Sequence, residues 1–595
     1  MLRRLTSHLS RVSIVEWISY AALATYLYLF LWGDSPVATG LAPYWFNPLW
    51  ATDDSVQQTY PFIRALHPGA FDNDFVTRMM INYIPPMHYW LGYTITLVTH
   101  DAIMTGHWIM LIQLCLAVFF IFGTVRYLTR HNTPAVFAVI WFLHTRHIIQ
   151  RITAGLPRGW AAPIIAAFFY FATRGNHRGV LATIAVGCLI HPPSTLAVSV
   201  AYGLYLLFQI ARKESRRAFL RPCIQFVVLT PIFFAITAWA VAKPTEFGGM
   251  TTYQEALSRP EFSSQEPRGR FTFVPFKPVY SEVSSFAFQA FTTPRFTRPA
   301  YFMKYYTPWI VGALALSLFW VGRRRRVIAF PHIFVAYGIA SAIVYAASRI
   351  LAFKLFVPDR HLQFPFAILF ILAFSVAVWR IATRSDDDTG SGTPTPQSHG
   401  YRGALLLMML GVIIYAGSGT GLYGAANFNY HKYKRGKVFE WIKNNTPLDA
   451  VVAGEPIFID PVQLFGERRG YITSETAHPF YTGYWQEARR RLEVSLRANY
   501  ARTSDEFLSS LSAEGISHFV FDRESLRGDR LKKAKYYAPF DRLVPELASH
   551  EPSEYLLRKL LSLPKEQLRS FVVYIDNRAV VVDLEAFRRA GIVVR

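Results

Sequence analysis

The sequence predicts an α-helical polytopic membrane protein that ends in an extracytoplasmic α/β domain. Of its 595 residues, 52% are hydrophobic and only 17% are charged, whereas soluble globular domains carry about 25% charged residues. Apolar runs long enough to cross a bilayer, roughly 20 residues each, recur from the N-terminal region to Leu422. The residues after Leu422 lack such runs and are numerous enough for one further domain.

The apolar runs predict about eleven transmembrane helices, of which the first is an uncleaved helix that follows a basic segment. These helices are expected near residues 12–33, 103–126, 134–149, 158–173, 178–191, 193–210, 222–242, 305–322, 327–347, 362–381 and 403–423. The stretch 85–100 is shorter and contains His88 and His100. We therefore expect it to form a helix at the outer membrane interface.

Basic clusters beside the apolar runs predict the orientation, because short cytoplasmic loops are enriched in Lys and Arg. Such clusters occur at 3–11, 126–130, 174–178, 212–221, 323–326 and 380–402. They place the N-terminus and a linker, 382–402, in the cytoplasm. They place the first loop, 34–102, a long second loop, 243–304, and the C-terminal domain on the other side, which we expect to be the outer face of a bacterial inner membrane.

The same basic clusters account for much of the formal net charge of +23. Arginines that abut membrane helices act as topology signals and contact lipid headgroups. The expected partner of the basic residues is therefore the lipid bilayer, and no nucleic acid is expected.

The C-terminal domain, 425–595, is predicted from short buried strands between helical segments. Strands are expected at 450–453 and 518–521 and in a hairpin of 571–575 and 579–582, and helices at 437–443, 505–511 and 553–561. Arg489-Arg490-Arg491 is interpreted as a solvated helix face. With no nucleophile motif, phosphate loop or zinc spacing there, the domain is predicted to be a lid or an acceptor-binding module. The other domain is 1–424.

The first outer loop concentrates carboxylates where there is little other charge. They are Asp53, Asp54, Asp72 and Asp74. Ionised groups beside a membrane are costly unless they meet water, a metal or a cationic partner. The cluster therefore indicates chemistry, with helix caps and turns as the alternative use of these residues.

Two other outer loops carry cations that the positive-inside rule disfavours there. One contains Arg146, Arg151 and Arg158, and the other contains Arg349, Lys354, Arg360 and His361. Arg binds phosphate oxygens through two hydrogen bonds and Lys supplies a point charge, so these residues are candidates to hold a polyanionic ligand. The alternatives are lipid headgroups or pairing with the first-loop aspartates.

His191 lies at an outer helix junction, directly before Pro192-Pro193. It joins the candidate cavity residues, with a structural hydrogen-bonding role as the alternative. An acidic loop that faces basic loops across an outer cavity suits group transfer from a phosphate-linked lipid. A carboxylate can deprotonate the acceptor hydroxyl while cations stabilise the leaving phosphate. The stretch 85–100 and the loop 243–304 could close over this site and exclude water.

The order of these features resembles a known superfamily. A single helix is followed by Asp53-Asp54, then Gln57-x-x-Tyr60-Pro61-Phe62, a helix led by Pro85-Pro86 and about ten further spans. This order resembles the GT-C superfamily of polytopic glycosyltransferases, and within it the bacterial YfhO-like and mannosyltransferase-like members. The C-terminal domain is similar to theirs in residues 438–447 and 515–522.

The resemblance implies that 1–424 is a catalytic domain. It would transfer a sugar from a polyprenyl-phosphate donor to a lipid, glycan or protein acceptor outside the cytoplasm. Asp53 or Asp54 would be the catalytic base or bind a divalent metal, and some of the outer-loop cations would hold the donor phosphate. Asp72-Asn73-Asp74 has the Asp-x-Asp spacing of the metal-dependent members, which makes Mg²⁺ or Mn²⁺ a candidate cofactor.

Two other classes of function stay open. A transporter or flippase would move an anionic lipid or solute through the cationic cavity, and it would be expected to show broken helices or repeated halves with charges near mid-membrane. A scaffold would bind other envelope proteins through its C-terminal domain. Substitution of Asp53 and Asp54 by Asn separates these classes, because only an enzyme loses turnover.

Overall fold

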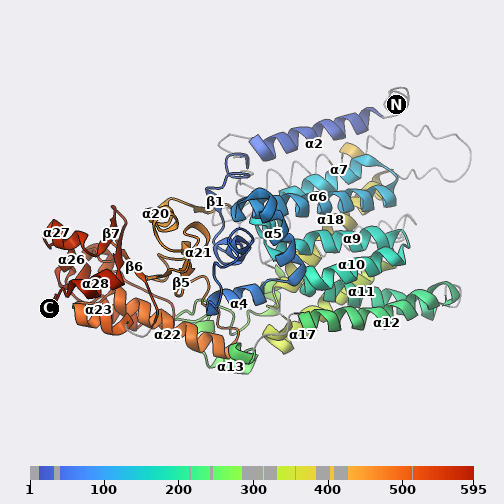
Figure 1. Ribbon diagram of the computed structural model, residues 1–595. Helices are drawn as coiled ribbons and strands as arrows, with labels where there is room; N and C mark the ends of the chain where they lie inside the picture. The colour runs from blue at the N-terminus through green and yellow to red at the C-terminus, as the bar shows by residue number, and fades with distance from the viewer. Residues whose placement is uncertain are drawn as a thin grey trace, which may run out of the picture.

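The computed structural model describes residues 13–32, 40–212, 216–240, 245–284, 313, 331–355, 357–383, 403–405, 407, 427–511 and 514–594. These residues form a helical bundle and, at one end of it, a domain that contains a mixed sheet (Figure 1). The expected spans 305–322 and 403–423 and the linker 382–402 lie almost entirely outside the described residues.

The bundle is built from apolar helices. They are α2 (Ile14–Trp32), α6 (Ala102–Thr129), α7 (Asn132–His144), α9 (Ala161–Thr173), α10 (His177–Ile190), α11 (Pro192–Ala211), α12 (Arg216–Ala240), α17 (His332–Leu351) and α18 (Arg360–Thr383). In the described part of the chain, α2, α6, α11, α12, α17 and α18 are long and apolar enough to cross a membrane. A multi-pass membrane protein is thus supported, while the number of eleven spans stays a prediction.

The predicted helix 134–149 is interrupted in the structure. Helix α7 ends at His144, Thr145 leaves the helical conformation with ψ of 88°, and the short helix α8 (Arg146–Ile152) follows. The break falls at four polar residues, His144-Thr145-Arg146-His147, which separate two apolar runs. The consequence is that Arg151 of α8 lies near the outer loops of the site.

The first outer loop is a compact series of short helices. They are α3 (Ser55–Gln58), the 3₁₀ helix η1 (Tyr60–Ala65) and α4 (Phe75–Tyr83), followed by α5 (Pro86–Thr99). Tyr60, Phe62 and Val76 are fully buried beneath them. The helix expected at 85–100 is therefore present as α5.

The C-terminal region contains a five-stranded sheet in the order β5-β4-β6-β8-β7. The strands are β4 (Val451–Gly454), β5 (Arg469–Gly470), β6 (His518–Asp522), β7 (Val572–Ile575) and β8 (Ala579–Asp583). β4 is parallel to β5 and β6, and β8 is antiparallel to β6 and β7. The predicted strands and hairpin are confirmed, because contiguous apolar residues such as those of β6 become buried on both faces.

Helices cover this sheet and connect it to the bundle. They include α20 (Val438–Asn445), α21 (Val462–Phe465), α22 (Thr482–Asn499), α23 (Ser504–Leu511), α26 (Leu556–Leu561) and α28 (Leu584–Ala590). The arginine run 489–491 lies on α22, which extends toward the bundle in Figure 1. Two of these arginines, Arg490 and Arg491, form ion pairs with Glu487.

A two-stranded sheet joins the first outer loop to the start of the C-terminal region. β1 (Trp50–Ala51) pairs antiparallel with β2 (Tyr430–His431), and the Lys432 backbone N–H donates to the Leu49 carbonyl at 2.8 Å. Because β1 directly precedes Thr52, this pairing places the beginning of the C-terminal region beside Asp53.

Candidate active site

The turn that carries Asp53 and Asp54 is held by reciprocal hydrogen bonds. The Thr52 N–H donates to Ser55 Oγ at 2.8 Å, and the Ser55 N–H donates to Thr52 Oγ1 at 3.1 Å. Both side chains are buried. The two aspartates between them are therefore presented on a rigid turn at the N-terminus of α3.

The two aspartates have different partners. Asp53 exchanges two hydrogen bonds with Asn429 of the C-terminal region, at 3.1 and 3.2 Å. Asp54 Oδ2 instead lies 2.6 Å from an Nη2 of Arg158 in the bundle. The structure thus brings Asp54, and not Asp53, against the predicted cations.

The Arg158 loop is clamped onto α6. A Cβ on Gly155, whose φ is +65°, would lie 2.2 Å from the Gly106 carbonyl oxygen, and one on Gly159 would lie 2.3 Å from Gln113 Oε1. Gln113 also donates to the Leu156 carbonyl at 3.0 Å. The approach at Gly155 meets backbone and has a positive φ, so it requires glycine, and the position of Arg158 depends on it.

Three arginines surround Asp54. Burial by itself would raise the pKa of Asp54, but Arg158, and more weakly Arg151 and Arg360, hold it below its ordinary value. Burial, together with Arg360 and Arg158, lowers the pKa of Arg151 to about 9. Asp54 and Asp359 only partly offset the repulsion among the three guanidiniums, so the site favours a further anion.

The other predicted cations lie elsewhere. Arg349 forms an ion pair with Glu282 at 3.0 Å and donates to the Lys277 carbonyl at 2.9 Å, so it holds the second outer loop. Lys354 is exposed on the 3₁₀ helix η6 (Ala352–Leu355). Their contact with a donor phosphate stays a prediction.

The predicted histidines form a row with a third, His88. Trp160 Nε1 donates to His88 Nδ1 at 2.9 Å, and His361 Nε2 donates to the Leu355 carbonyl at 2.7 Å. His191 caps α11 by accepting from the Ser194 N–H at 3.4 Å. Burial lowers the pKa of His88 and of His191 to about 3, so these two imidazoles are neutral and supply hydrogen bonds without charge.

The candidate metal ligands are used locally. Asp72 pairs with Arg64 at 3.0 Å, and Asp74 caps α4 by accepting from the Thr77 N–H and Oγ1 at 2.8 and 2.7 Å. Among the described residues, no group of three or more His, Cys, Asp or Glu side chains could hold a metal ion. These residues therefore do not fit a Mg²⁺ or Mn²⁺ site.

The C-terminal region contributes side chains that the sequence did not indicate. Glu475 Oε2 accepts from Gln57 Nε2 at 3.2 Å and pairs with Arg270 at 3.0 Å. His478 Nε2 also contacts Oε1 of Gln57. No local pattern could reveal this contact, because Gln57 and Glu475 are 418 residues apart in the chain.

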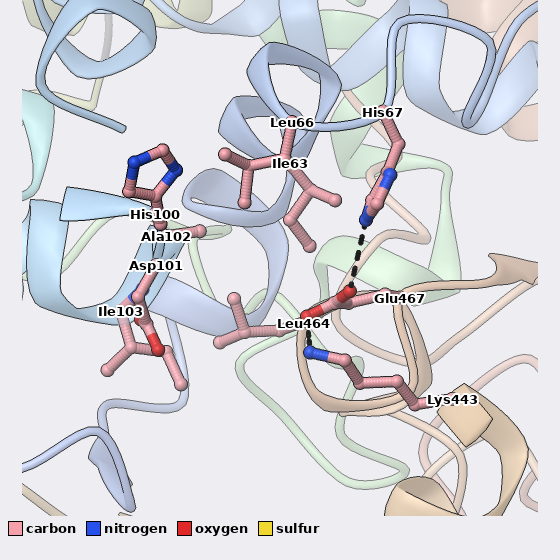
Figure 2. Close-up of a pocket in the computed structure, with 10 residues that line it drawn as sticks. All are labelled: Ile63, Leu66, His67, His100, Asp101, Ala102, Ile103, Lys443, Leu464 and Glu467. Carbon is pink, nitrogen blue, oxygen red and sulfur yellow. Dashed lines mark hydrogen bonds and ion pairs between the residues drawn. The ribbon is translucent and has the colours of Figure 1, made fainter. Parts of the chain in front are cut away.

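A separate cavity of about 370 Å³ lies on another side of the first loop (Figure 2). Its wall includes His67, Asp101, Lys443 and Glu467, and Glu467 contacts both Lys443 and His67. It shares no lining residue with the arginine group around Asp54. The cavity and the candidate active site are thus distinct places on the first loop.

No protein-family model matches the chain, and no curated protein matches its sequence. Among solved structures, two are similar to it over most of the chain. The apo oligosaccharyltransferase of Archaeoglobus fulgidus is 12% identical with a TM-score of 0.48, over 90% of this chain and 72% of that chain. ArnT from Cupriavidus metallidurans bound to undecaprenyl phosphate is 12% identical with a TM-score of 0.47, over 96% and 98%. The YfhO-like subtype stays a prediction.

Proposed function

We propose that the chain is a membrane glycosyltransferase that transfers a sugar from a polyprenyl-phosphate donor to a lipid, glycan or protein acceptor outside the cytoplasm. The observation that supports it is the 2.6 Å contact of Asp54 with Arg158, beside Arg151 and Arg360. A carboxylate next to a group of guanidiniums supplies both a base for the acceptor and a binding site for the leaving phosphate.

In the proposed reaction, an acceptor hydroxyl oxygen attacks the anomeric carbon of the donor sugar. The bond from that carbon to the phosphate oxygen breaks, and the acceptor proton moves to Asp54. The departing polyprenyl phosphate gains negative charge, which Arg151, Arg158 and Arg360 stabilise. No step is assigned to a metal ion.

The ion pair also links donor binding to the strength of the base. While Arg158 contacts Asp54, the pKa of the carboxylate is low, which keeps it ionised but weakly basic. A donor phosphate that draws Arg158 to itself raises the pKa of Asp54. The base is therefore strongest when the donor is in place.

The test is release of free polyprenyl phosphate by the purified protein in lipid, with a panel of sugar donors and acceptors. We expect release by the wild type and its loss in Asp54→Asn. The matched control is Glu493→Gln, which removes a carboxylate that pairs with Arg497 on the exposed side of α22. Added Mg²⁺, Mn²⁺ or chelator tests metal dependence.

Equal release by the wild type and Asp54→Asn would contradict the proposal. Movement of an anionic lipid across the bilayer without any release would instead support the transporter alternative.

A further inference from the structure

The C-terminal region reaches the candidate active site through one tight loop. Thr473 and Thr476 exchange backbone to side-chain hydrogen bonds, each at 3.2 Å. The Glu475 N–H donates to Asp460 Oδ1 at 2.8 Å, and Asp460 is itself buried. Glu475 is thus held in place by its own domain before it meets the first outer loop.

The orientation of the Gln57 amide follows from His478. His478 Nε2 contacts Gln57 Oε1 and lies 2.9 Å from the Glu475 carbonyl oxygen. The backbone carbonyl oxygen of Glu475 can only accept, so Nε2 carries the hydrogen. The amide oxygen of Gln57 therefore faces His478, and its NH₂ group faces the carboxylates.

The NH₂ group of Gln57 lies between two carboxylates. Its Nε2 is 3.2 Å from Glu475 Oε2 and 3.5 Å from Asp54 Oδ1, and Gln57 as a whole is only 3% exposed. The other oxygen of Asp54 is taken by Arg158. Both oxygens of the Asp54 carboxylate thus have a partner, which defines the plane of the carboxylate.

Glu475 is anchored on its far side by the second outer loop. Arg270 Nη2 lies 3.0 Å from Glu475 Oε2, and Arg270 Nη1 donates to the Ala477 carbonyl at 3.3 Å. Arg158, Asp54, Gln57, Glu475 and Arg270 therefore form a continuous series of contacts. The series joins the bundle, the first outer loop, the C-terminal region and the second outer loop.

We infer that Glu475 is a positioning residue for Asp54, acting through the Gln57 amide. In this arrangement the carboxylate of Asp54 is oriented for the acceptor only while the C-terminal region is in contact with the first loop. The inference rests on the proposed function and adds a residue from the C-terminal region to it.

The titratable and charged groups around the two carboxylates determine how a substitution of Glu475 changes the pKa of Asp54. Those that face Asp54 are Arg158, Arg151, Arg360, Tyr83, Asp53, His478 and Glu475; those that face Glu475 are Arg270, Asp460, Asp53, Asp54, His478 and Tyr430. Neighbouring negative charges raise one another's pKa. Loss of the Glu475 charge should therefore lower the pKa of Asp54.

The experiment compares full-length variants in lipid by the polyprenyl phosphate release assay. We expect Glu475→Gln to lower kcat roughly 10- to 100-fold, the range that a small misplacement of a reacting group produces, with KM for the donor unchanged. The acid limb of its kcat profile should move to lower pH. Glu493→Gln should keep the wild-type kcat and profile.

A second variant, Gln57→Leu, removes the bridge and leaves Glu475 intact. We expect a similar fall in kcat, and the double variant should lose no more than either single variant, because both act through one contact. Thermal unfolding identifies any variant that is simply destabilised, and the other variant then carries the test.

Wild-type kcat and an unmoved acid limb in Glu475→Gln, or losses that add in the double variant, would overturn the inference while the proposed function stands. A wild type that releases no polyprenyl phosphate from any donor with any acceptor would overturn both.

Discussion

Asp54 and Asp74 belong to the same outer loop and each precedes a short helix, yet their carboxylates have different kinds of partner. Asp74 caps α4 with two hydrogen bonds from Thr77. Asp54 makes no cap hydrogen bond to α3 and contacts Arg158 of the bundle instead. A carboxylate that does not cap the backbone of its own helix is thus available to a cation from a distant segment.

The electrostatics of the two groups diverge for the same reason. Burial raises the pKa of Asp74, and the hydrogen bonds from Thr77 only partly oppose it. Burial acts on Asp54 as well, but Arg158, Arg151 and Arg360 outweigh it and lower its pKa. One carboxylate is a structural cap and the other is the charged centre of a cationic site.

The largest expected difference between the two aspartates is in their effect on turnover. Asp54→Asn should lower kcat roughly 10²- to 10⁴-fold, the usual contribution of a general base. Asp74→Asn should lower it far less, because Asn caps helices about as well as Asp. Release of polyprenyl phosphate measures both, and an equal fall in the two variants would remove the distinction.

The next largest expected effect is on phosphate binding by the arginines around Asp54. Arg151→Gln should weaken binding of polyprenyl phosphate by about 1.5–3 kcal/mol, roughly 10- to 150-fold in Kd. Titration of the lipid onto the protein in detergent measures it, with the thermal unfolding temperature as a check on folding. Arg497→Gln, on the exposed side of α22, should leave the Kd unchanged; unaltered binding in Arg151→Gln would place the phosphate elsewhere.

A smaller effect concerns the cap. Asp74→Ala should lower the free energy of unfolding by about 1 kcal/mol, because the first turn of α4 loses its acceptor. Asp74→Asn should retain most of that stability. Denaturant unfolding in detergent compares the two variants, and equal stability of Asp74→Ala and wild type would show that the cap contributes nothing.

The smallest effect is the pH dependence of stability. The folded pKa of Asp54 is lowered, so its ionised form contributes stability above the ordinary Asp value of about 3.9, and this is lost as pH falls through the folded pKa. The folded pKa of Asp74 is raised, so stability increases as pH falls through that pKa toward the ordinary value. Unfolding temperatures of Asp54→Asn and Asp74→Asn against wild type should therefore diverge in opposite directions on acidification.

Much of the fold could be predicted from local pattern. Helices α6, α11 and α18 and strands β6 and β8 lie close to their expected positions, because long apolar runs are buried in a membrane or a sheet wherever they fall. The expected helix 134–149 is wrong at its end, because it continues through the polar residues His144 to His147, where α7 stops.

The candidate site could be predicted only as a set of residue types. Asp54, Arg158 and Arg360 come together, whereas Asp53 binds Asn429 and Arg349 binds Glu282. The charge of each of these residues can be read from the sequence. Which acid meets which base depends on contacts between distant segments.

By itself, the sequence determined that the chain is a membrane protein with an acidic first loop, further loops rich in basic residues and a C-terminal part with both strands and helices. These properties depend on hydrophobicity and charge over contiguous residues, which the unfolded chain already contains. Only the tertiary structure decided that Asp54 faces the arginines and that Glu475 meets Gln57 across 418 residues. Such contacts depend on how four segments pack, and a hydrogen bond of about 3 Å exists only once packing has placed both partners.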